Sequence, residues 1–405
     1  MSGEFTSSQF QIPEAMFRGK HVLVSAYMSS HDVDVGSQGD SPTIKSLMGV
    51  IEEQGGKADY LSYCELGATG LLIRFMERLK KKSISNHISG SHTRWMYTAS
   101  FHFLTHVLSR IDILMRHKVM SLKSSHYDIY IFFYPYLFAT LKRQLSYSDS
   151  AVKVLFEANV ERRFFEFQFS KSRLNPLKNL LVKLVGIMET KAISRSDAIL
   201  TVALRDAKDL RTNFSSKRIY TLPLCEETGD WSREKKQFVR VPDVLRMKDS
   251  DIGPDTIKVT FVGSNYSLNV QSVEELIGLA RKMSECKDRI KFIVVGNVNQ
   301  AFDDRFELPD NIIFTGYLRD FDDVMSASDY FVLFDYMGTG IESKSRIYSH
   351  YPGLTLALTN ESEEYLRILK EKLISFDCVD SMERFLRECS FVERKYFETV
   401  YPSAK

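Results

Sequence analysis

The chain has 405 residues, of which 44% are hydrophobic and 26% are charged. This composition is typical of globular proteins and excludes a disordered chain, and the length predicts two domains rather than one core. The formal net charge of +2 gives no indication of a nucleic-acid partner.

Five cysteines are scattered along the chain without the paired spacing of a zinc site or a disulfide framework. The N-terminal residues lack the apolar segment of a signal peptide. The apolar run at residues 129–141 is shorter than the roughly 20 residues that span a bilayer. We therefore expect a cytoplasmic protein with reduced thiols and no metal site.

The N-terminal half alternates between strand and helix patterns. An apolar strand at residues 21–27 is followed by a loop rich in Ser, Asp and Gly, and then by a helix that begins at Ser41 and ends at Gly55. Further strands are predicted at residues 58–63, 127–134, 152–156, 198–202 and 219–222, with helices at 135–145, at 174–194 and from 205. The charged stretch 226–253 is the predicted linker.

Residues 71–125 are helical in pattern and locally basic, with Lys80, Lys81 and Lys82 at the end of one apolar segment. Two interpretations stay open. The segment consists of ordinary packed helices with a solvated face, or it lies on a membrane and contacts anionic lipid, which would make the protein peripheral on the inner face of a membrane.

The C-terminal half repeats the alternation, with strands predicted at residues 257–262, 290–296, 311–316, 330–334 and 354–358 and helices between them. The chain therefore predicts an α/β protein with two doubly wound, Rossmann-like domains, residues 1–228 and 255–381. Ligands bind such sheets beyond the carboxyl ends of the strands, and Gly263 and Gly338 both lie there, so they could face one central cleft.

The stretch 329–359 reads as strand, glycine turn, helix and strand. Its turn carries Gly338 and Gly340, and its helix begins with Lys344 and Arg346. Free backbone N–H groups beside two cations are how a protein holds a phosphate or a diphosphate. Asp335, at the end of the strand, is either a ligand contact or a turn residue.

Several segments in order resemble the C-terminal domain of GT-B-fold glycosyltransferases of glycosyltransferase family four. They are residues 261–265, 292–296, 308–317, 329–334, 338–341 and Lys344. The N-terminal half resembles the family more loosely, at residues 128–131, 154–161, 188–189, 196–201 and 219–223. The likeness is clearest over residues 255–360.

The resemblance implies a hexosyltransferase (EC 2.4 class) that moves a sugar from a nucleotide-sugar to the hydroxyl of a glycan or a lipid-linked acceptor, with retention and without a metal or other cofactor. The nucleotide would bind the C-terminal domain and the acceptor the N-terminal one. The final helix, about 382–405, would cross back onto the N-terminal domain.

The resemblance also implies site residues. Lys344 would be catalytic, because a lysine stabilises the charge that a leaving diphosphate gains. Glu342 is the second catalytic candidate from the sequence itself, or else a carboxylate at the helix start that complements the helix dipole. The donor would contact Gly263, Ser264, Asn265, Tyr317, Asp335, Gly338, Thr339, Gly340, Ile341, Arg346 and Tyr348. The acceptor side would include Gly36, Ser37, Gly39, Asp40, Glu157 and Glu161.

One departure from the family pattern concerns the donor ribose. The family has a glutamate in the helix after the lysine, where this chain has Ile347 or Tyr348, and a tyrosine hydroxyl is the neutral substitute. The lysine and arginine after the first strand of the domain are replaced by Asn265 and Tyr266. Two alternatives therefore stay open, a catalytically silent binding or scaffold protein and a sugar-nucleotide epimerase of the same fold.

Overall fold

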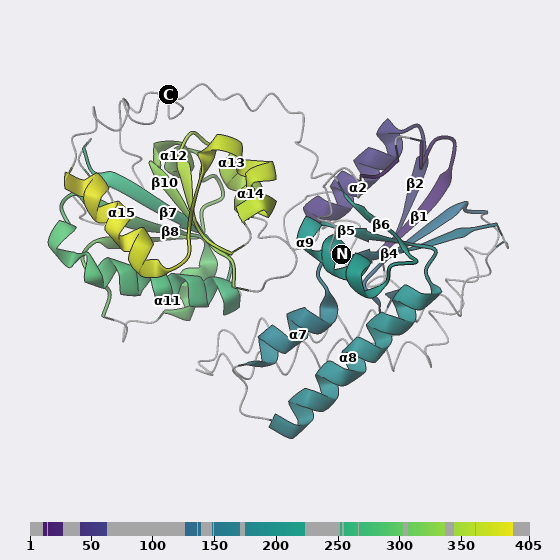
Figure 1. Cartoon of the computed structure of the whole chain (residues 1–405). Coiled ribbons are helices and arrows are strands. Elements are labelled where there is room, and N and C mark those ends of the chain that lie inside the picture. Colours follow the sequence, from purple (N-terminus) through teal and green to yellow (C-terminus); the bar gives the residue numbers. More distant parts are fainter. Residues whose placement is uncertain are drawn as a thin grey trace. The chain divides into compact units, whose positions relative to one another are not determined.

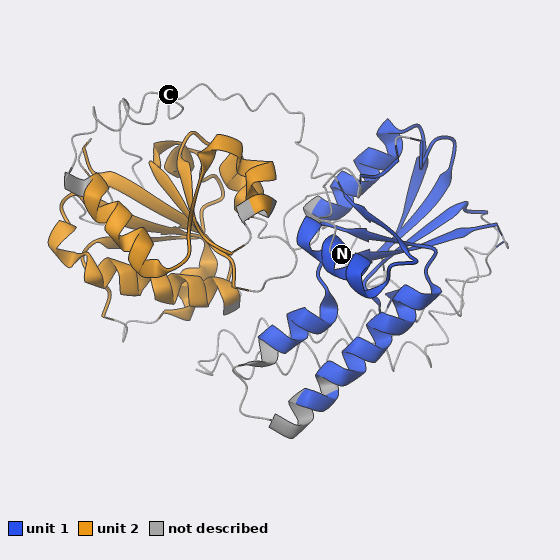
Figure 2. Cartoon of the chain, in the orientation of Figure 1, with its two compact units in different colours: residues 1–227, 337–341 blue, residues 228–336, 342–405 orange. Residues whose placement is uncertain are grey.

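The computed structural model divides into two compact units, residues 1–227 with 337–341 and residues 228–336 with 342–405 (Figure 2). The structure describes residues 11–13, 15–26, 41–62, 126–135, 137–138, 148, 150–170, 175–222, 252, 255–265, 267–302, 307–336, 344–360 and 362–391. The basic segment 71–125 and the loop 27–40 lie outside these ranges.

The first unit is a six-stranded sheet in the order β2-β1-β3-β4-β5-β6 (Figure 1). Every neighbouring pair is parallel. The strands are β1 (His21–Ala26), β2 (Lys57–Ser62), β3 (Ile129–Phe133), β4 (Val152–Glu157), β5 (Ala198–Thr201) and β6 (Arg218–Thr221). The helices are α2 (Ser41–Glu53), α7 (Glu161–Ser170), α8 (Asn175–Arg195) and α9 (Leu204–Asn213).

The second unit has the order β12-β11-β10-β7-β8-β9, again all parallel. Its strands are β7 (Ile257–Val262), β8 (Ile290–Val295), β9 (Ile312–Gly316), β10 (Tyr330–Phe334), β11 (Leu354–Leu358) and β12 (Leu373–Phe376). Its helices are α11 (Ser267–Lys282), α12 (Asp322–Ala327), α13 (Lys344–Ser349), α14 (Ser362–Leu369) and α15 (Val379–Phe391), with short 3₁₀ turns η4 (Ser284–Cys286), η5 (Asn297–Ala301) and η6 (Lys370–Lys372).

The central strands are apolar throughout because both faces of each sheet are covered. All five residues of β3 and of β10 are buried, as are all six of β8. In the second unit, α11 and α15 pack into the core on one face, and α12 packs on the opposite face with Ile293, Val295 and Ile313. Parallel sheets read as continuous hydrophobic runs for this reason, which is why the strand predictions agree closely with the structure.

An aspartate directly before a strand sets the register of the neighbouring strand at three places. Asp128 accepts the N–H of His21 at 2.9 Å, Asp197 that of Lys153 at 2.8 Å, and Asp329 that of Lys258 at 2.9 Å. Each aspartate also donates its own N–H to the carbonyl of that same partner residue. The pairs join β3 to β1, β5 to β4 and β10 to β7, so each sheet has such a lock at its amino edge.

The expectation for the final helix needs a correction. Met382, Leu386 and Cys389 of α15 are buried in the core of the second unit, against the same face as α11. Their apolar spacing places them on one side of the helix, and the sheet they cover is the nearest apolar surface. Residues 382–391 therefore belong to the second unit, and residues 392–405 lie outside the described residues.

Candidate functional site

The topology of the second unit creates a switch point between β7 and β10. From β7 the chain continues to β8 on one side, while β10 continues to β11 on the other. Ligands of open parallel sheets bind in the crevice that such a reversal leaves at the carboxyl ends. The residues that follow the two strands are Gly263 to Asn265 after β7, and Asp335 and Tyr336 after β10.

The turn after β7 is braced by the turn after β8. The N–H of Gly263 donates to the carbonyl of Val295 at 2.9 Å, and the N–H of Asn265 donates to Oδ1 of Asn297 at 2.9 Å. From the start of α11, Asn269 donates its amide to the carbonyl of Ser264 at 3.0 Å. These bonds hold the turn in a fixed position at the N-terminus of α11, where backbone N–H groups attract anions.

Two glycines make this close approach of the two turns possible. Gly296 has φ +109°, and a Cβ there would lie 2.2 Å from the carbonyl oxygen of Gly263. A Cβ on Gly263 would lie 2.7 Å from the ring of Phe261. Both positions therefore require glycine, one for its backbone conformation and both for space.

Phe261 links the glycine turn to the lysine of α13. Its ring fills the space that a Cβ on Gly263 would enter, and the ammonium of Lys344 lies 5.2 Å from the centroid of the same ring. The cation–π contact places the positive charge beside the turn after β7. Two features that lie 81 positions apart in the sequence thus meet at the switch point.

Tyr348 has a structural position that the sequence does not indicate. Its side chain is completely buried and stacks on Phe331 with ring centroids 4.8 Å apart. Its hydroxyl is 3.2 Å from the N–H of Val262, from which it accepts, and 3.2 Å from the carbonyl of Val332, to which it donates.

The β7–β10 ladder pairs only Tyr330 with Val259 and Phe331 with Thr260. Beyond those pairs the two strands separate, and the hydroxyl of Tyr348 bridges them at the start of the crevice. Both hydrogen-bonding roles of the phenol are used inside the sheet, so we correct the expectation that Tyr348 contacts a ribose.

The first unit gathers carboxyl groups at the carboxyl end of β4. Glu157, the last residue of β4, is fully buried, and among the described residues neither of its carboxyl oxygens has a hydrogen-bond partner. Glu161 begins α7, Glu189 lies in α8 and Asp206 lies in α9, and all three are buried. Four elements therefore bring an acid each to one place.

Burial raises the pKa of Glu157 well above its usual range, and repulsion from Glu189, Glu161 and Asp206 adds to the rise. Burial also raises the pKa of Glu189 to about 7, opposed by the N–H groups of Arg162 and Glu161, which its carboxyl group caps. The bond from the N–H of Arg162 is 3.4 Å long. The structure thus favours uncharged carboxyl groups here, and within the described ranges no cluster of His, Cys, Asp or Glu has the geometry of a metal site.

No family model matches the chain, and no curated protein matches its sequence. Solved structures do resemble it in fold. TarM is 11% identical over 92% of each chain, with a TM-score of 0.55. A trehalose-6-phosphate protein of E. coli, bound to UDP-2-fluoro glucose, is 11% identical over 95% of this chain and 94% of its own, with a TM-score of 0.55. The catalytic domain of starch synthase IV from Arabidopsis thaliana, bound to ADP and acarbose, is 10% identical over 96% and 95%, with a TM-score of 0.51.

The chain has the GT-B fold. Two Rossmann-like units with parallel six-stranded sheets confirm the predicted fold class. The identity to these structures is too low to carry more than the fold. No helix among the described residues is long and apolar enough to cross a membrane.

The other predicted donor residues of this GT-B chain lie at different places in the second unit. Asp335 follows β10, and its Oδ2 accepts from the hydroxyl of Tyr365 at 2.9 Å, which anchors it to α14. Arg346 lies on α13, and Tyr317 follows β9 with 75% of its surface exposed. The predicted residues outside the described ranges are Gly36, Ser37, Gly39, Asp40, Gly338, Thr339, Gly340, Ile341 and Glu342.

Sequence reasoning named Glu157 and Glu161 but did not name Glu189 or Asp206 as site residues. Glu189 appeared only as part of a family-like segment. A signal for it lies in the spacing of α8, because Glu189 precedes the buried residues Ala192 and Ile193 by three and four positions and so shares their side of the helix.

Proposed function

We propose that the protein is a glycosyltransferase that uses a nucleoside diphosphate sugar, which it binds at the switch point of the second unit. The observation that carries the proposal is the position of Lys344 over the ring of Phe261, beside the turn at Gly263. A fixed glycine turn, a helix N-terminus and an ammonium group form a site for a diphosphate.

In the proposed reaction the bond between the anomeric carbon and the diphosphate oxygen breaks, an acceptor hydroxyl oxygen bonds to that carbon, and the hydroxyl proton passes to the departing diphosphate. The departing diphosphate gains negative charge, which Lys344 and the backbone N–H groups after β7 stabilise. Positive charge from a lysine serves this purpose without a metal ion. Retention of configuration is proposed from the family resemblance.

Other predicted residues keep their proposed roles. The segment with Gly338, Thr339, Gly340, Ile341 and Glu342 connects β10 to α13, so it begins and ends at the carboxyl edge. We propose that it completes the diphosphate site, with Glu342 beside the reacting sugar. Tyr317, which follows β9, is proposed to lie beside the base through its backbone. Ser264, Asn265, Asp335 and Arg346 are proposed as further donor contacts.

The acceptor is proposed to be a glycan or a lipid-linked hydroxyl compound that binds the first unit. Glu157 and Glu161 lie at the carboxyl end of β4, and in the sequence Gly36, Ser37, Gly39 and Asp40 come after β1. We propose that Glu161 and these four residues orient the acceptor. Glu157 is fully buried, and we propose that it supports Glu161 from behind.

The experiment is a thermal-shift screen with nucleoside diphosphates and their sugars. One of them is expected to raise the melting temperature, and Lys344→Ala is expected to remove most of that rise. Lys287→Ala is the matched control, because Lys287 lies just before the amino end of β8 and, within the part of the chain that the structure describes, forms an ion pair with the exposed Asp310 alone. If no nucleotide shifts the melting temperature, or if both variants lose the shift equally, the proposal is wrong.

A second candidate function is nucleotide binding without sugar transfer. It is favoured by α13, which carries no acidic residue and commits the hydroxyl of Tyr348 to the sheet. Slow release of diphosphate from a nucleotide-sugar without acceptor, lost in Lys344→Ala, would favour the enzyme. Conversion to an isomeric nucleotide-sugar without acceptor would instead indicate an epimerase.

A further inference from the structure

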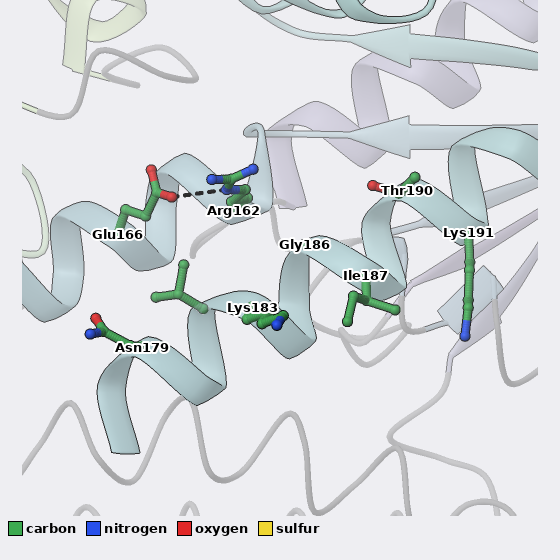
Figure 3. A pocket seen from close by; sticks show the side chains of 9 residues that line it. Arg162, Glu166, Asn179, Lys183, Gly186, Ile187, Thr190 and Lys191 are labelled. Atoms are coloured by element: carbon green, nitrogen blue, oxygen red, sulfur yellow. Dashed lines mark hydrogen bonds and ion pairs between the residues drawn. The ribbon is translucent and has the colours of Figure 1, made fainter. Parts of the chain in front are cut away.

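Helices α7 and α8 of the first unit cross closely and leave a groove between them (Figure 3). The two helices approach each other closely at Gly186, since a Cβ there would lie 3.2 Å from Cδ of Arg162. The groove encloses about 760 Å³. Its described lining residues are Arg162, Glu166, Asn179, Val182, Lys183, Gly186, Ile187, Thr190 and Lys191.

The cations around this groove are only partly neutralised. Arg162 pairs with Glu166 along α7, with a nitrogen–oxygen distance of 2.9 Å. Lys183 and Lys191 of α8 are both exposed, and within the part of the chain that the structure describes neither has an ion pair or a hydrogen bond. Among the described residues, no acidic side chain neutralises these two positive charges.

Exposed apolar side chains share the stripe with these lysines. Leu180 is 52% exposed and Ile187 is 41% exposed, which makes them two of the few large apolar side chains exposed among the described residues. At 100° per residue, Leu180, Lys183, Ile187 and Lys191 fall within an arc of about 80°, over a length of about 16 Å. Ile187 and Lys191 extend to the same side of α8 (Figure 3).

We propose that this stripe of α8, defined as Leu180, Lys183, Ile187 and Lys191, is the surface by which the protein docks on an anionic lipid membrane. A soluble anion would need only the two lysines. A membrane surface also uses the apolar side chains, which enter the boundary between headgroups and acyl chains while the lysines reach the lipid phosphates. The stripe combines both kinds of residue in alternation.

This inference rests on the proposed function where it concerns the acceptor: docking through the first unit would bring the acceptor-binding domain to a membrane that holds lipid-linked acceptors. The docking itself does not depend on the donor site. The two proposals can therefore fail separately, one in a vesicle assay and the other in the nucleotide thermal shift.

The test is co-sedimentation of the full chain with vesicles of phosphatidylglycerol in phosphatidylcholine. We expect binding that weakens with added salt and is absent with phosphatidylcholine alone. Lys183→Gln with Lys191→Gln is expected to lower the partition coefficient roughly 25-fold, about fivefold for each lysine near an anionic surface. Leu180→Ser with Ile187→Ser is expected to lower it as well.

Matched controls make the same changes elsewhere. Lys45→Gln with Lys57→Gln removes two exposed lysines of the same unit on α2 and β2, and Leu366→Ser replaces an exposed leucine of α14. Both controls are expected to bind vesicles as the unchanged protein does.

The docking proposal is overturned if the unchanged protein stays in the supernatant at low salt, or if the α8 variants bind as the controls do. A concentration-dependent dimer that the α8 variants abolish, without vesicle binding, would assign the stripe to a second copy instead and would also overturn it. The nucleotide thermal shift, measured on every variant, shows whether each still folds and whether the donor site is unaffected.

Discussion

The carboxyl cluster of the first unit predicts a specific dependence of stability on pH. Burial raises the pKa of Glu189 to about 7 in the folded chain, against an ordinary value of 4.5. Below pH 4.5 the carboxyl group is protonated in both states. Between those pH values the unfolded chain releases the proton while the folded chain keeps it, so the free energy of unfolding falls as pH rises through about 7 and then levels off.

The magnitude follows from the size of the pKa difference. A rise from 4.5 to about 7 corresponds to about 3 kcal/mol at 1.36 kcal/mol per pKa unit, fully present as a penalty above pH 7. Glu189→Gln has nearly the same shape, carries no charge, and can still accept the N–H of Arg162 through its amide oxygen. The variant is expected to match the unchanged protein near pH 4.5 and to be more stable by about 3 kcal/mol at pH 8.

Urea unfolding followed by circular dichroism at a series of pH values measures this difference directly. Subtracting the two curves removes the titrating groups that do not interact with Glu189, such as Asp310 and Asp380, whose pKa values are lowered by Lys287 and Lys282. The difference that remains includes the relief of Glu157, whose pKa the charge of Glu189 raises. Glu166→Gln on α7 is the control, because Glu166 is 46% exposed and, among the described residues, forms an ion pair with Arg162 alone. Parallel curves for Glu189→Gln and the unchanged protein would refute the reasoning.

Three further predictions concern the second unit. Asp329→Ala removes the carboxylate that lies 3.3 Å from the ammonium of Lys258, whose side chain is only 8% exposed. In urea titrations the variant is expected to lose about 3 kcal/mol of unfolding free energy. A loss smaller than that of the exposed-pair variant Asp310→Ala would contradict the role of Asp329 in joining β10 to β7. Tyr348→Phe removes the hydroxyl that bridges β7 and β10 and is expected to lower the free energy of unfolding by about 2 kcal/mol, while any thermal shift with nucleotide is kept. Loss of that shift at unchanged stability would instead support the original prediction that Tyr348 contacts the ribose. In Gly296→Ala the new Cβ would lie 2.2 Å from the carbonyl oxygen of Gly263, so the variant is expected not to fold stably. In Gly278→Ala on α11 the new Cβ has no atom within 4 Å, so that variant is expected to be more stable by up to about 1 kcal/mol. Similar circular-dichroism melting curves for the two variants would count against the role given to Gly296.

The strands of both units could be predicted from the sequence because their burial on both faces leaves a continuous apolar run. The predicted limits of β7 and β10 agree with the structure residue for residue. The edge strand β12 and helix α14 were not predicted. The residues of β12 are only partly buried or exposed, so its composition lacks the apolar run that reveals the central strands.

Local chemistry also indicated the parts of the donor site. Gly263 and Lys344 stood out because a glycine turn after a strand and a lysine at a helix start have a direct use in phosphate binding. Which side chain joins them could not be predicted, because Phe261 is one of several apolar residues in its strand. Only the packed sheet shows that the ring of Phe261 lies close to both Gly263 and the ammonium of Lys344.

Tyr348 and Glu189 show the limit of such reasoning. A tyrosine near a ligand-binding turn suggests a contact, but the place of its hydroxyl depends on two strands that separate beyond Phe331. A glutamate in a helix suggests a solvated face, yet Glu189 is buried with acids from three other elements. Each case depends on segments far apart in the sequence.

By itself, the sequence determined the alternation of buried strands and helices, the two Rossmann-like domains and the residue types at the carboxyl edge of the second sheet. Those features follow from local periodicity and turn chemistry, which act within a few residues. The tertiary structure alone decided that α15 belongs to the second unit, that the hydroxyl of Tyr348 bridges β7 and β10, and that four acids meet at the end of β4. Such outcomes depend on which surfaces pack together, and packing brings into contact residues whose separation along the chain carries no information about their distance in space.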